Sequence, residues 1–301
     1  MAAATAEVIA IFGPTAVGKT GVAIELAALL RERGEEPVAV SCDAIQVYRG
    51  LEVLSGAPSA SERELLEHRL VGFVDPGEEF SAGRFAELAR AEIDDLLDAG
   101  RTPIVVGGTG LYMRAALAEL DLQPPVAAEI REGVEAQVAE AGPAALHAEL
   151  EPDVAARVHP NDRKRVARAL ELQRAGLDPP ERGRELWTAR LRHPTTLSGI
   201  VVGREELAER IDRRVEAMLD TGAGAEAAAL EASGASRTAA AALGREEALR
   251  GDAEAMKSAH RRYARRQMTW LRKMEGLETV ERDGLSDAEV AARIAVASGR
   301  G

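Results

Sequence analysis

The segment from Gly13 to Thr20 has the form G-x-x-x-x-G-K-[ST], the pattern of a phosphate-binding loop. Its residues are Gly13, Pro14, Thr15, Ala16, Val17, Gly18, Lys19 and Thr20. An apolar run, Val8–Phe12, precedes the loop, and apolar residues at helical spacing follow it as far as Gly34. A strand, a glycine-rich loop and a helix in this order gather backbone N–H groups that bind a diphosphate or triphosphate. The segment therefore predicts a phosphate site, with Lys19 at the terminal phosphates and the Thr20 hydroxyl as a ligand of Mg²⁺.

Apolar runs typical of buried strands recur along the chain, and helical patterns lie between most of them. These runs are Val8–Phe12, Pro37–Ser41, Leu70–Val74, Thr102–Val106 and Thr196–Val202. Ser81 and Gly100 bracket one helical pattern as N-cap and stop, and Ser286 with Glu289 has capping-box spacing before a final helix. This alternation predicts an α/β fold, a P-loop NTPase-like core with a mostly parallel sheet flanked by helices.

The stretch between Val106 and Thr196 interrupts the alternation. It contains helical patterns, several prolines and no convincing strand. We therefore expect an inserted all-helical subdomain over 116–194. The core then comprises 1–115 and 195–301, and it includes the C-terminal helices.

Composition limits the compartment and the class of protein. The 301 residues include 46% hydrophobic and 29% charged residues, as in ordinary soluble proteins. We find no signal peptide and no run long enough to span a membrane, and the single cysteine excludes an intramolecular disulfide. These features predict a cytoplasmic protein without a membrane partner. The net charge of −12 argues weakly against a general affinity for nucleic acid.

One segment is basic in spite of the acidic total. Between 257 and 273 it carries Lys257, Arg261, Arg262, Arg265, Arg266, Arg272 and Lys273, with no acidic residue after Lys257. A helical stripe runs through it at Tyr263, Gln267, Trp270 and Met274. Binding of a phosphate backbone is one interpretation, and a core-facing stripe with solvated charges is the other. A weaker basic segment, 161–168, lies in the expected insertion.

Two polar residues follow directly on expected strands. Asp43 comes after the second, and Thr109 lies in Gly107-Gly108-Thr109-Gly110 after the fourth. Ligands of an open parallel sheet bind at the carboxyl ends of its strands, so both should face the phosphate loop. Asp43 could accept a proton or help to hold a metal, or simply make a turn. The fourth strand ends without the acidic residue that holds Mg²⁺ in ATP-hydrolysing proteins, which argues against plain ATPase chemistry.

Two arginines lie beside the apolar stripe of a helix that follows the last expected strand. Arg210 and Arg214 are four residues apart and could project from one edge of that helix. A guanidinium group suits a diphosphate because it binds bidentately. A solvated helix face is the alternative interpretation.

Taken in order, these motifs closely resemble those of the tRNA dimethylallyltransferase family. The matching segments are Gly13–Thr20, Asp43–Gly50, Gly107–Tyr112, His159–Asp162, Arg165–Glu171, Arg210–Arg214 and Arg262–Trp270. The resemblance covers nearly the whole chain. It implies transfer of a dimethylallyl group from dimethylallyl diphosphate to the exocyclic N6 amine of the adenine 3′-adjacent to the tRNA anticodon. It also implies that the loop holds this diphosphate instead of ATP.

The resemblance further implies roles for individual residues. Asp43 is the general base, and Thr109 assists at the leaving diphosphate, whose charge is neutralised by Lys19, Mg²⁺ and Arg210 or Arg214. Gln46 reads the target base. The residues that contact the anticodon stem-loop of tRNA are Asp43, Ala44, Ile45, Gln46, Thr109, Arg131, Asn161, Asp162, Arg163, Lys164, Arg165, Arg265, Arg266, Gln267, Trp270 and Arg272. We expect the protein to act as a monomer.

The chain departs from the family pattern at three places. Ala44 stands where the family usually has Ser, Leu54–Pro58 lacks a usual Lys, and Gly244–Glu247 differs from a Gly-Tyr-Lys-Glu-like motif. Three other functions stay open: a phosphate-loop kinase of a small metabolite, an isopentenyltransferase acting on free AMP, and a non-catalytic RNA-binding protein. The loop, Asp43, Gln46 and Thr109 are all present, so we expect activity on tRNA.

Overall fold

The computed structural model describes residues 8–120, 122–123, 125–177 and 190–300, which form two compact units. The first unit spans 1–119 and 185–301, and the second spans 120–184. Among the described residues, no helix is both long and apolar enough to cross a membrane.

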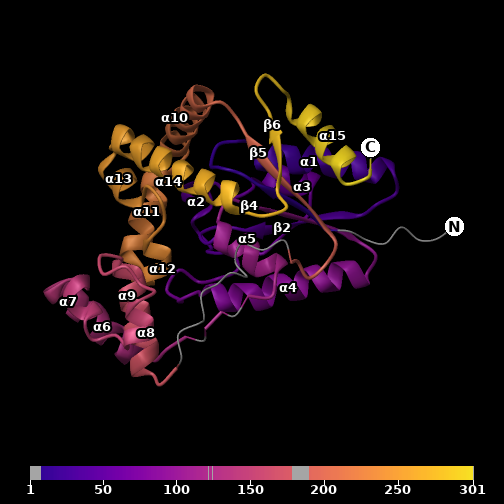
Figure 1. The fold of residues 1–301 in the computed structure, drawn as a ribbon. Helices are drawn as coiled ribbons and strands as arrows, with labels where there is room; N and C mark the ends of the chain where they lie inside the picture. The colour runs from indigo at the N-terminus through magenta and orange to yellow at the C-terminus, as the bar shows by residue number, and fades with distance from the viewer. Residues whose placement is uncertain (1–7, 121, 124, 178–189, 301) are drawn as a thin grey trace. The chain divides into compact units, whose positions relative to one another are not determined.

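A six-stranded sheet forms the centre of the first unit (Figure 1). Its order is β3 (His68–Arg69), β2 (Pro37–Cys42), β4 (Thr102–Gly107), β1 (Val8–Phe12), β5 (Thr195–Val201) and β6 (Glu278–Glu281). Every neighbouring pair is parallel, which puts the carboxyl ends of all six strands along one edge. The predicted α/β class with a mostly parallel sheet is confirmed.

Helices cover both faces of this sheet (Figure 1). On one face, α1 (Lys19–Glu32) and α15 (Asp287–Ala297) share an apolar core with alternate residues of the strands, such as Ile9 and Ile11. On the other, α4 (Ala82–Asp98) packs on α5 (Gly110–Leu117), where Phe85 stacks on Tyr112 at 4.3 Å between ring centroids. The N-cap at Ser81 and the capping box of Ser286 with Glu289 are confirmed.

The strand predicted over Leu70–Val74 is wrong. The chain pairs with β2 only at His68 and Arg69, since Leu70 and Gly72 then adopt positive φ angles of 60° and 63°. A left-handed residue turns the backbone out of the sheet, which ends the strand. The edge strand β6 was not predicted, because its Glu278, Thr279 and Glu281 are exposed and only Val280 is buried.

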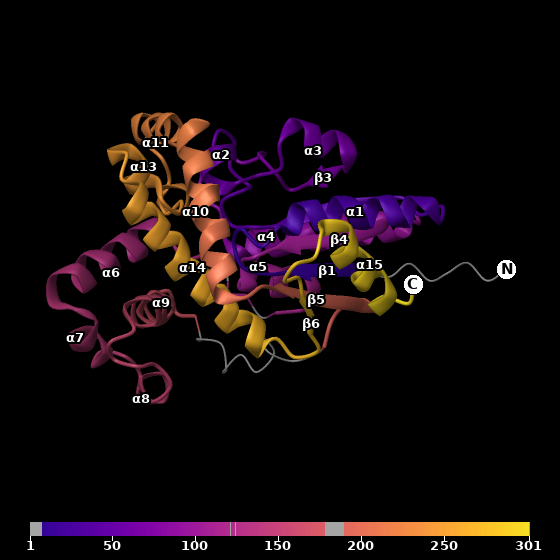
Figure 2. The ribbon, with the colours of Figure 1, turned by 90° about the horizontal axis from the view of Figure 1, so that it is seen from above.

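Helices from the C-terminal half and two short helices after β2 complete the first unit. They are α2 (Glu52–Ser55), α3 (Ala60–Leu65), α10 (Arg204–Asp220), α11 (Ala223–Ala232), α12 (Arg237–Ala240), α13 (Arg245–Arg250) and α14 (Ala253–Lys273). Helices α10 and α14 lie side by side, as both views show (Figures 1 and 2).

The second unit is a small helical body with its own core. It contains α6 (Ala128–Ala141), α7 (Pro143–His147), α8 (Pro152–Ala155) and α9 (Arg163–Arg174). Val134, Leu146 and Val166 are among the buried residues that hold these helices together. Asp162 caps α9 by accepting a hydrogen bond from the backbone N–H of Arg165 at 3.1 Å.

Candidate active site

The phosphate loop connects β1 to α1. Ala16 and Gly18 have φ angles of 64° and 89°, and this left-handed backbone turns successive N–H groups inward. Lys19 Nζ donates to the carbonyl oxygens of Gly13 at 3.0 Å and Pro14 at 2.9 Å. Burial and, to a smaller extent, the charge of Arg214 lower the pKa of Lys19 to about 7, although the charge of Asp43 partly opposes them. The lysine is therefore a proton-sensitive cation within the loop.

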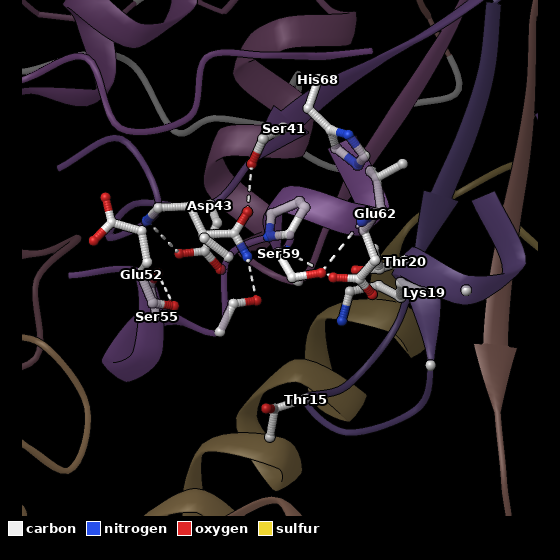
Figure 3. Close-up of a pocket in the computed structure, with 18 of the residues that line it drawn as sticks. Thr15, Lys19, Thr20, Ser41, Asp43, Glu52, Ser55, Ser59, Glu62 and His68 are labelled. Carbon is white, nitrogen blue, oxygen red and sulfur yellow. Dashed lines mark hydrogen bonds between the residues drawn. The ribbon is translucent and has the colours of Figure 1, made fainter. Parts of the chain in front are cut away.

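A cavity of 960 Å³ opens in front of this loop, wholly within the first unit. Its walls are the loop, the carboxyl ends of β2 and β4, the segment 52–63 and one face of α10, together with Gln267 of α14 and Asp287 of α15. Figure 3 shows Thr15, Lys19 and Thr20 along the loop, with Asp43 across the cavity from them. The sheet topology explains this meeting, because β1, β2 and β4 are neighbours that end at the same edge.

Asp43 is held in place by its own turn. Its Oδ1 accepts hydrogen bonds from the backbone N–H groups of Ile45 at 2.9 Å and Gln46 at 3.4 Å. Within the described part of the chain, Oδ2 has no hydrogen-bond donor. The turn and the catalytic interpretation are thus compatible, since one oxygen fixes the carboxylate and the other can accept a proton. Ala44 and Ile45 form the half-buried remainder of this turn.

Gln46 connects two walls of the cavity. Its Oε1 accepts a hydrogen bond from the Ser41 hydroxyl at 2.8 Å, and its Nε2 donates to the Gly56 carbonyl at 3.2 Å. The amide thereby ties the end of β2 to the segment 52–63. That Gln46 reads a base stays a prediction.

The structure separates the two candidate arginines. Arg214 lines the cavity and lies so close to Gly56 that a Cβ there would be 1.6 Å from Nη2. Burial lowers the pKa of Arg214, although the charges of Asp43 and Glu62 oppose this. Arg210, one turn earlier on α10, forms an ion pair with Glu206 at 2.7 Å and does not line the cavity. The geometry thus favours Arg214 as the cation that meets a diphosphate.

The glycine-rich segment after β4 lies against α14. A Cβ at Gly108 would be 2.2 Å from Gln267 Nε2, and one at Gly110 would be 2.3 Å from the Trp270 ring. Thr109 Oγ1 is 3.4 Å from the Tyr263 hydroxyl, whose pKa is raised to about 12 mainly by burial. Tyr263 therefore stays protonated and can serve as a hydrogen-bond donor beside Thr109.

Gln267 joins the two loops. Its Oε1 accepts from the Thr15 N–H at 2.8 Å, and its Nε2 donates to the Gly108 carbonyl at 2.9 Å. The side chain is 3% exposed, so its amide serves the loops in this structure. The prediction that Gln267 contacts tRNA stays a prediction.

The basic segment of α14 is only partly neutralised. Lys257 pairs with Glu216 and Glu254, and Arg261 pairs with Asp212. Arg265, Arg266 and Arg272 are exposed, and no described acidic side chain pairs with them. Arg266 lies over the Tyr263 ring, with Cζ 5.4 Å from its centroid. The segment itself has no acidic residue, and α10 supplies acidic partners for Lys257 and Arg261, whereas Arg265, Arg266 and Arg272 face solvent.

The second unit carries the remaining predicted tRNA contacts. Asn161, Arg163, Lys164 and Arg165 are exposed at the start of α9, Asp162 is the N-cap of that helix, and Arg131 is half-buried on α6. Arg165 also lies 3.4 Å from the Asp162 carboxylate.

We expect the affinity for inorganic diphosphate to decrease as the pH rises above 7. Lys19 is positively charged below its pKa of about 7 and neutral above it, and only the cation attracts the anion. Diphosphate also changes its protonation over this pH range, and a ratio of two dissociation constants cancels that change. Calorimetry therefore measures the Kd of Lys19→Met divided by the Kd of the wild type at each pH. This ratio should fall by up to about tenfold per pH unit above 7. A ratio that does not change between pH 6 and 9 would contradict the lowered pKa.

The fold and the cavity define a phosphate-loop α/β protein whose loop faces a carboxylate. The model of the IPP transferase family matches residues 46–274, and that of isopentenyl transferase matches residues 6–75. The chain belongs to the IPP transferase family.

Individual relatives agree with this assignment. A tRNA dimethylallyltransferase of Anaeromyxobacter dehalogenans (strain 2CP-C) is 44% identical, over 88% of this chain and 91% of its own length. The tRNA isopentenylpyrophosphate transferase of Bacillus halodurans has a similar structure, with a TM-score of 0.69, 31% identity, and coverage of 98% of this chain and 96% of that one. A eukaryotic dimethylallyltransferase acting on tRNA gives a TM-score of 0.71 at 25% identity, and the match covers 98% of this chain and 80% of that one.

Proposed function

We propose that this protein transfers a dimethylallyl group from dimethylallyl diphosphate to N6 of the adenine 3′-adjacent to the tRNA anticodon, releasing diphosphate. The observation that carries the proposal is a single cavity that joins a phosphate loop to a carboxylate with one oxygen unpaired. The absence of an acidic residue at the end of β4, where the chain reads Gly107-Gly108-Thr109, supports a diphosphate donor over ATP.

The proposed step is an alkyl transfer. The lone pair of the adenine N6 forms a bond to the allylic carbon, while the bond from that carbon to the diphosphate oxygen breaks and its electrons leave with the diphosphate. Asp43 Oδ2 takes the proton that N6 loses. The Asx turn holds the carboxylate in position, so little reorganisation is needed at the moment of transfer.

Charge on the departing diphosphate needs cations and N–H donors in place. The loop N–H groups at the start of α1 and the Arg214 guanidinium supply them, and Lys19 exchanges its bonds to Gly13 and Pro14 for bonds to the phosphate oxygens. Thr109, with the protonated Tyr263 beside it, assists at the bridging oxygen. Such electrostatic stabilisation is usually the largest single contribution to catalysis.

We also propose that Mg²⁺ accompanies the diphosphate. Thr20 lies in the first turn of α1 at the cavity and offers its hydroxyl. No group of three or more His, Cys, Asp or Glu among the described residues could hold a metal by itself. An ion that takes most of its ligands from phosphate oxygens and water fits this donor set, as Mg²⁺ does. Bound there, it neutralises charge on the leaving group.

The acceptor is proposed to be tRNA instead of free AMP. The exposed arginines lie on α14, the helix whose Gln267 lines the cavity, and Arg266 lies over Tyr263, whose hydroxyl is 3.4 Å from Thr109 Oγ1. The second unit adds Arg131 and residues 161–165 as proposed tRNA contacts. A mononucleotide needs neither basic surface, whereas the phosphates of an anticodon stem need both. The adenine must be flipped out of the loop to reach Asp43.

The direct test is incubation with labelled dimethylallyl diphosphate, Mg²⁺ and unmodified tRNA that has adenine beside the anticodon. AMP as acceptor and ATP as donor serve as parallel controls. We expect label on tRNA alone. Label on AMP would replace the proposal with a free-nucleotide isopentenyltransferase, and phosphoryl transfer from ATP would replace it with a kinase.

Arg214 and Arg210 offer a matched pair for the donor site. We expect Arg214→Met to raise KM for dimethylallyl diphosphate by about a hundredfold, the usual effect of losing a charge-assisted contact to phosphate. Arg210→Met should stay close to the wild type, because Arg210 is used by Glu206 outside the cavity. Steady-state kinetics at saturating tRNA measure both. Equal increases in KM for the two variants would show that a change anywhere on α10 weakens donor binding, and that the position of Arg214 in the cavity is not the cause.

The substrate also bears on compartment and assembly. We propose cytoplasmic action, since tRNA is found there and the single, buried cysteine is compatible with reducing conditions. We propose a monomer, because this chain by itself supplies the loop, Asp43 and Arg214 that the proposed step needs.

A further inference from the structure

A buried arginine outside the cavity holds the phosphate loop from behind. Arg282 follows β6 directly and is 4% exposed. Its Nη1 donates to the carbonyl oxygen of Val17 in the loop, and its Nη2 donates to Asp287 Oδ1 at 2.7 Å. The parallel sheet explains this reach, since β6 and β1 flank β5 and end at the same edge.

Two glycines of the loop region leave the space that this pair occupies. A Cβ at Gly18 would lie 2.2 Å from Arg282 Nη1, and a Cβ at Gly21 would lie 1.9 Å from Asp287 Oδ2. Gly21 is in the first turn of α1 and has no positive φ, so its backbone conformation does not require glycine. The close approach of Asp287 therefore accounts for the glycine at position 21.

A bound diphosphate would change some of the hydrogen bonds that hold the phosphate loop and leave others in place. In the proposed step Lys19 exchanges its bonds to the Gly13 and Pro14 carbonyls for bonds to phosphate oxygens. Among the described residues, Gln267 at the Thr15 N–H and Arg282 at the Val17 carbonyl are then the side chains from distant segments with a hydrogen bond to the loop. Val17 immediately precedes Gly18, Lys19 and Thr20, whose N–H groups face the ligand in such loops.

We propose that Arg282 is a positioning residue for the diphosphate site and that Asp287 orients it. By fixing the Val17 carbonyl, Arg282 sets the direction of the N–H groups that follow and thereby the affinity for the donor. Arg282 does not line the cavity, so it acts through the loop and not on the ligand. The inference rests on the proposed function only in taking diphosphate as the ligand of the loop.

The test compares Arg282→Met with Arg300→Met. Both arginines belong to the C-terminal segment and are paired with a carboxylate, but Arg300 contacts Glu35 beyond the far end of α1. We expect Arg282→Met to raise the Kd for inorganic diphosphate and the KM for dimethylallyl diphosphate together by about tenfold or more. The kcat at saturating donor and the Kd for tRNA should change far less. Arg300→Met should lower Tm to a similar extent and leave the Kd for diphosphate unchanged.

A third variant separates geometry from charge. Arg282→Lys keeps the positive charge but cannot bridge Val17 and Asp287 as a planar guanidinium does, so the weak diphosphate binding should persist. Full recovery with lysine, or a loss of Tm in Arg282→Met without any change in Kd, would overturn the proposal. If the wild type transfers no dimethylallyl group yet binds diphosphate in an Arg282-dependent manner, the proposed function fails and this inference stands.

Discussion

Asp43→Asn is expected to lower kcat for dimethylallyl transfer by about a thousandfold, the usual contribution of a general base. Asparagine can still accept the hydrogen bonds of Ile45 and Gln46, so the turn after β2 should survive. It cannot take a proton from the adenine amine. Binding of tRNA should therefore stay nearly intact, which single-turnover transfer and filter binding together will measure.

The control for this change is Asp75→Asn. Asp75 makes the same kind of turn, accepting from the Gly77 N–H at 2.8 Å, but lies outside the cavity. It should transfer at the wild-type rate. Since the charge of Asp43 raises the pKa of Lys19, the assay is run below pH 7, where Lys19 is mostly protonated. Normal turnover by Asp43→Asn would remove Asp43 from the role of general base.

Reversing two charges on α14 is expected to weaken tRNA binding strongly. In the double variant Arg265→Glu with Arg266→Glu, two exposed cations become anions on the surface proposed to meet the anticodon stem. We expect the Kd for tRNA to rise by about a hundredfold and its salt dependence to weaken by roughly two counterions. The Kd for diphosphate should not change, because neither side chain lines the cavity.

A matched double variant separates the effect of the position on α14 from the effect of the changed net charge. Arg213→Glu with Arg250→Glu changes the total charge by the same amount at two exposed positions on α10 and α13. It should bind tRNA almost as the wild type does. If both double variants lose affinity equally, long-range charge accounts for binding and α14 is not the specific contact.

The core of the fold was predictable because local patterns determine it. The loop from Gly13 to Thr20 predicts a strand before it and a helix after it, and β1 and α1 lie at these places. Ser81 and Ser286 marked the starts of α4 and α15 through side-chain hydrogen bonds that span only three residues. Edge strands carry less signal. β3 is two residues long and β6 has one buried side chain, so neither has the apolar run that indicates a buried strand.

The candidate site was predictable only in part. The place of Asp43 at the cavity was predictable because the residues after parallel strands meet at one edge of the sheet, whereas the roles of Asp43 and Thr109 stay predictions. The choice between Arg210 and Arg214 was not available, because both have the same spacing from the apolar stripe. The choice depends on Glu206, which forms an ion pair with Arg210, and on Gly56, whose missing side chain leaves room for Arg214.

The sequence by itself determined the phosphate loop, the class of the fold, the family and the carboxylate that faces the loop, since each shows in short motifs or in local patterns of apolar residues. Only the tertiary structure decided which cations remain available. Lys257 and Arg261 are neutralised by α10, Gln267 is enclosed between two loops, and Arg282 reaches Val17 past the end of β5. Such pairings depend on distances between segments far apart in sequence, and spacing along the chain holds no information about them.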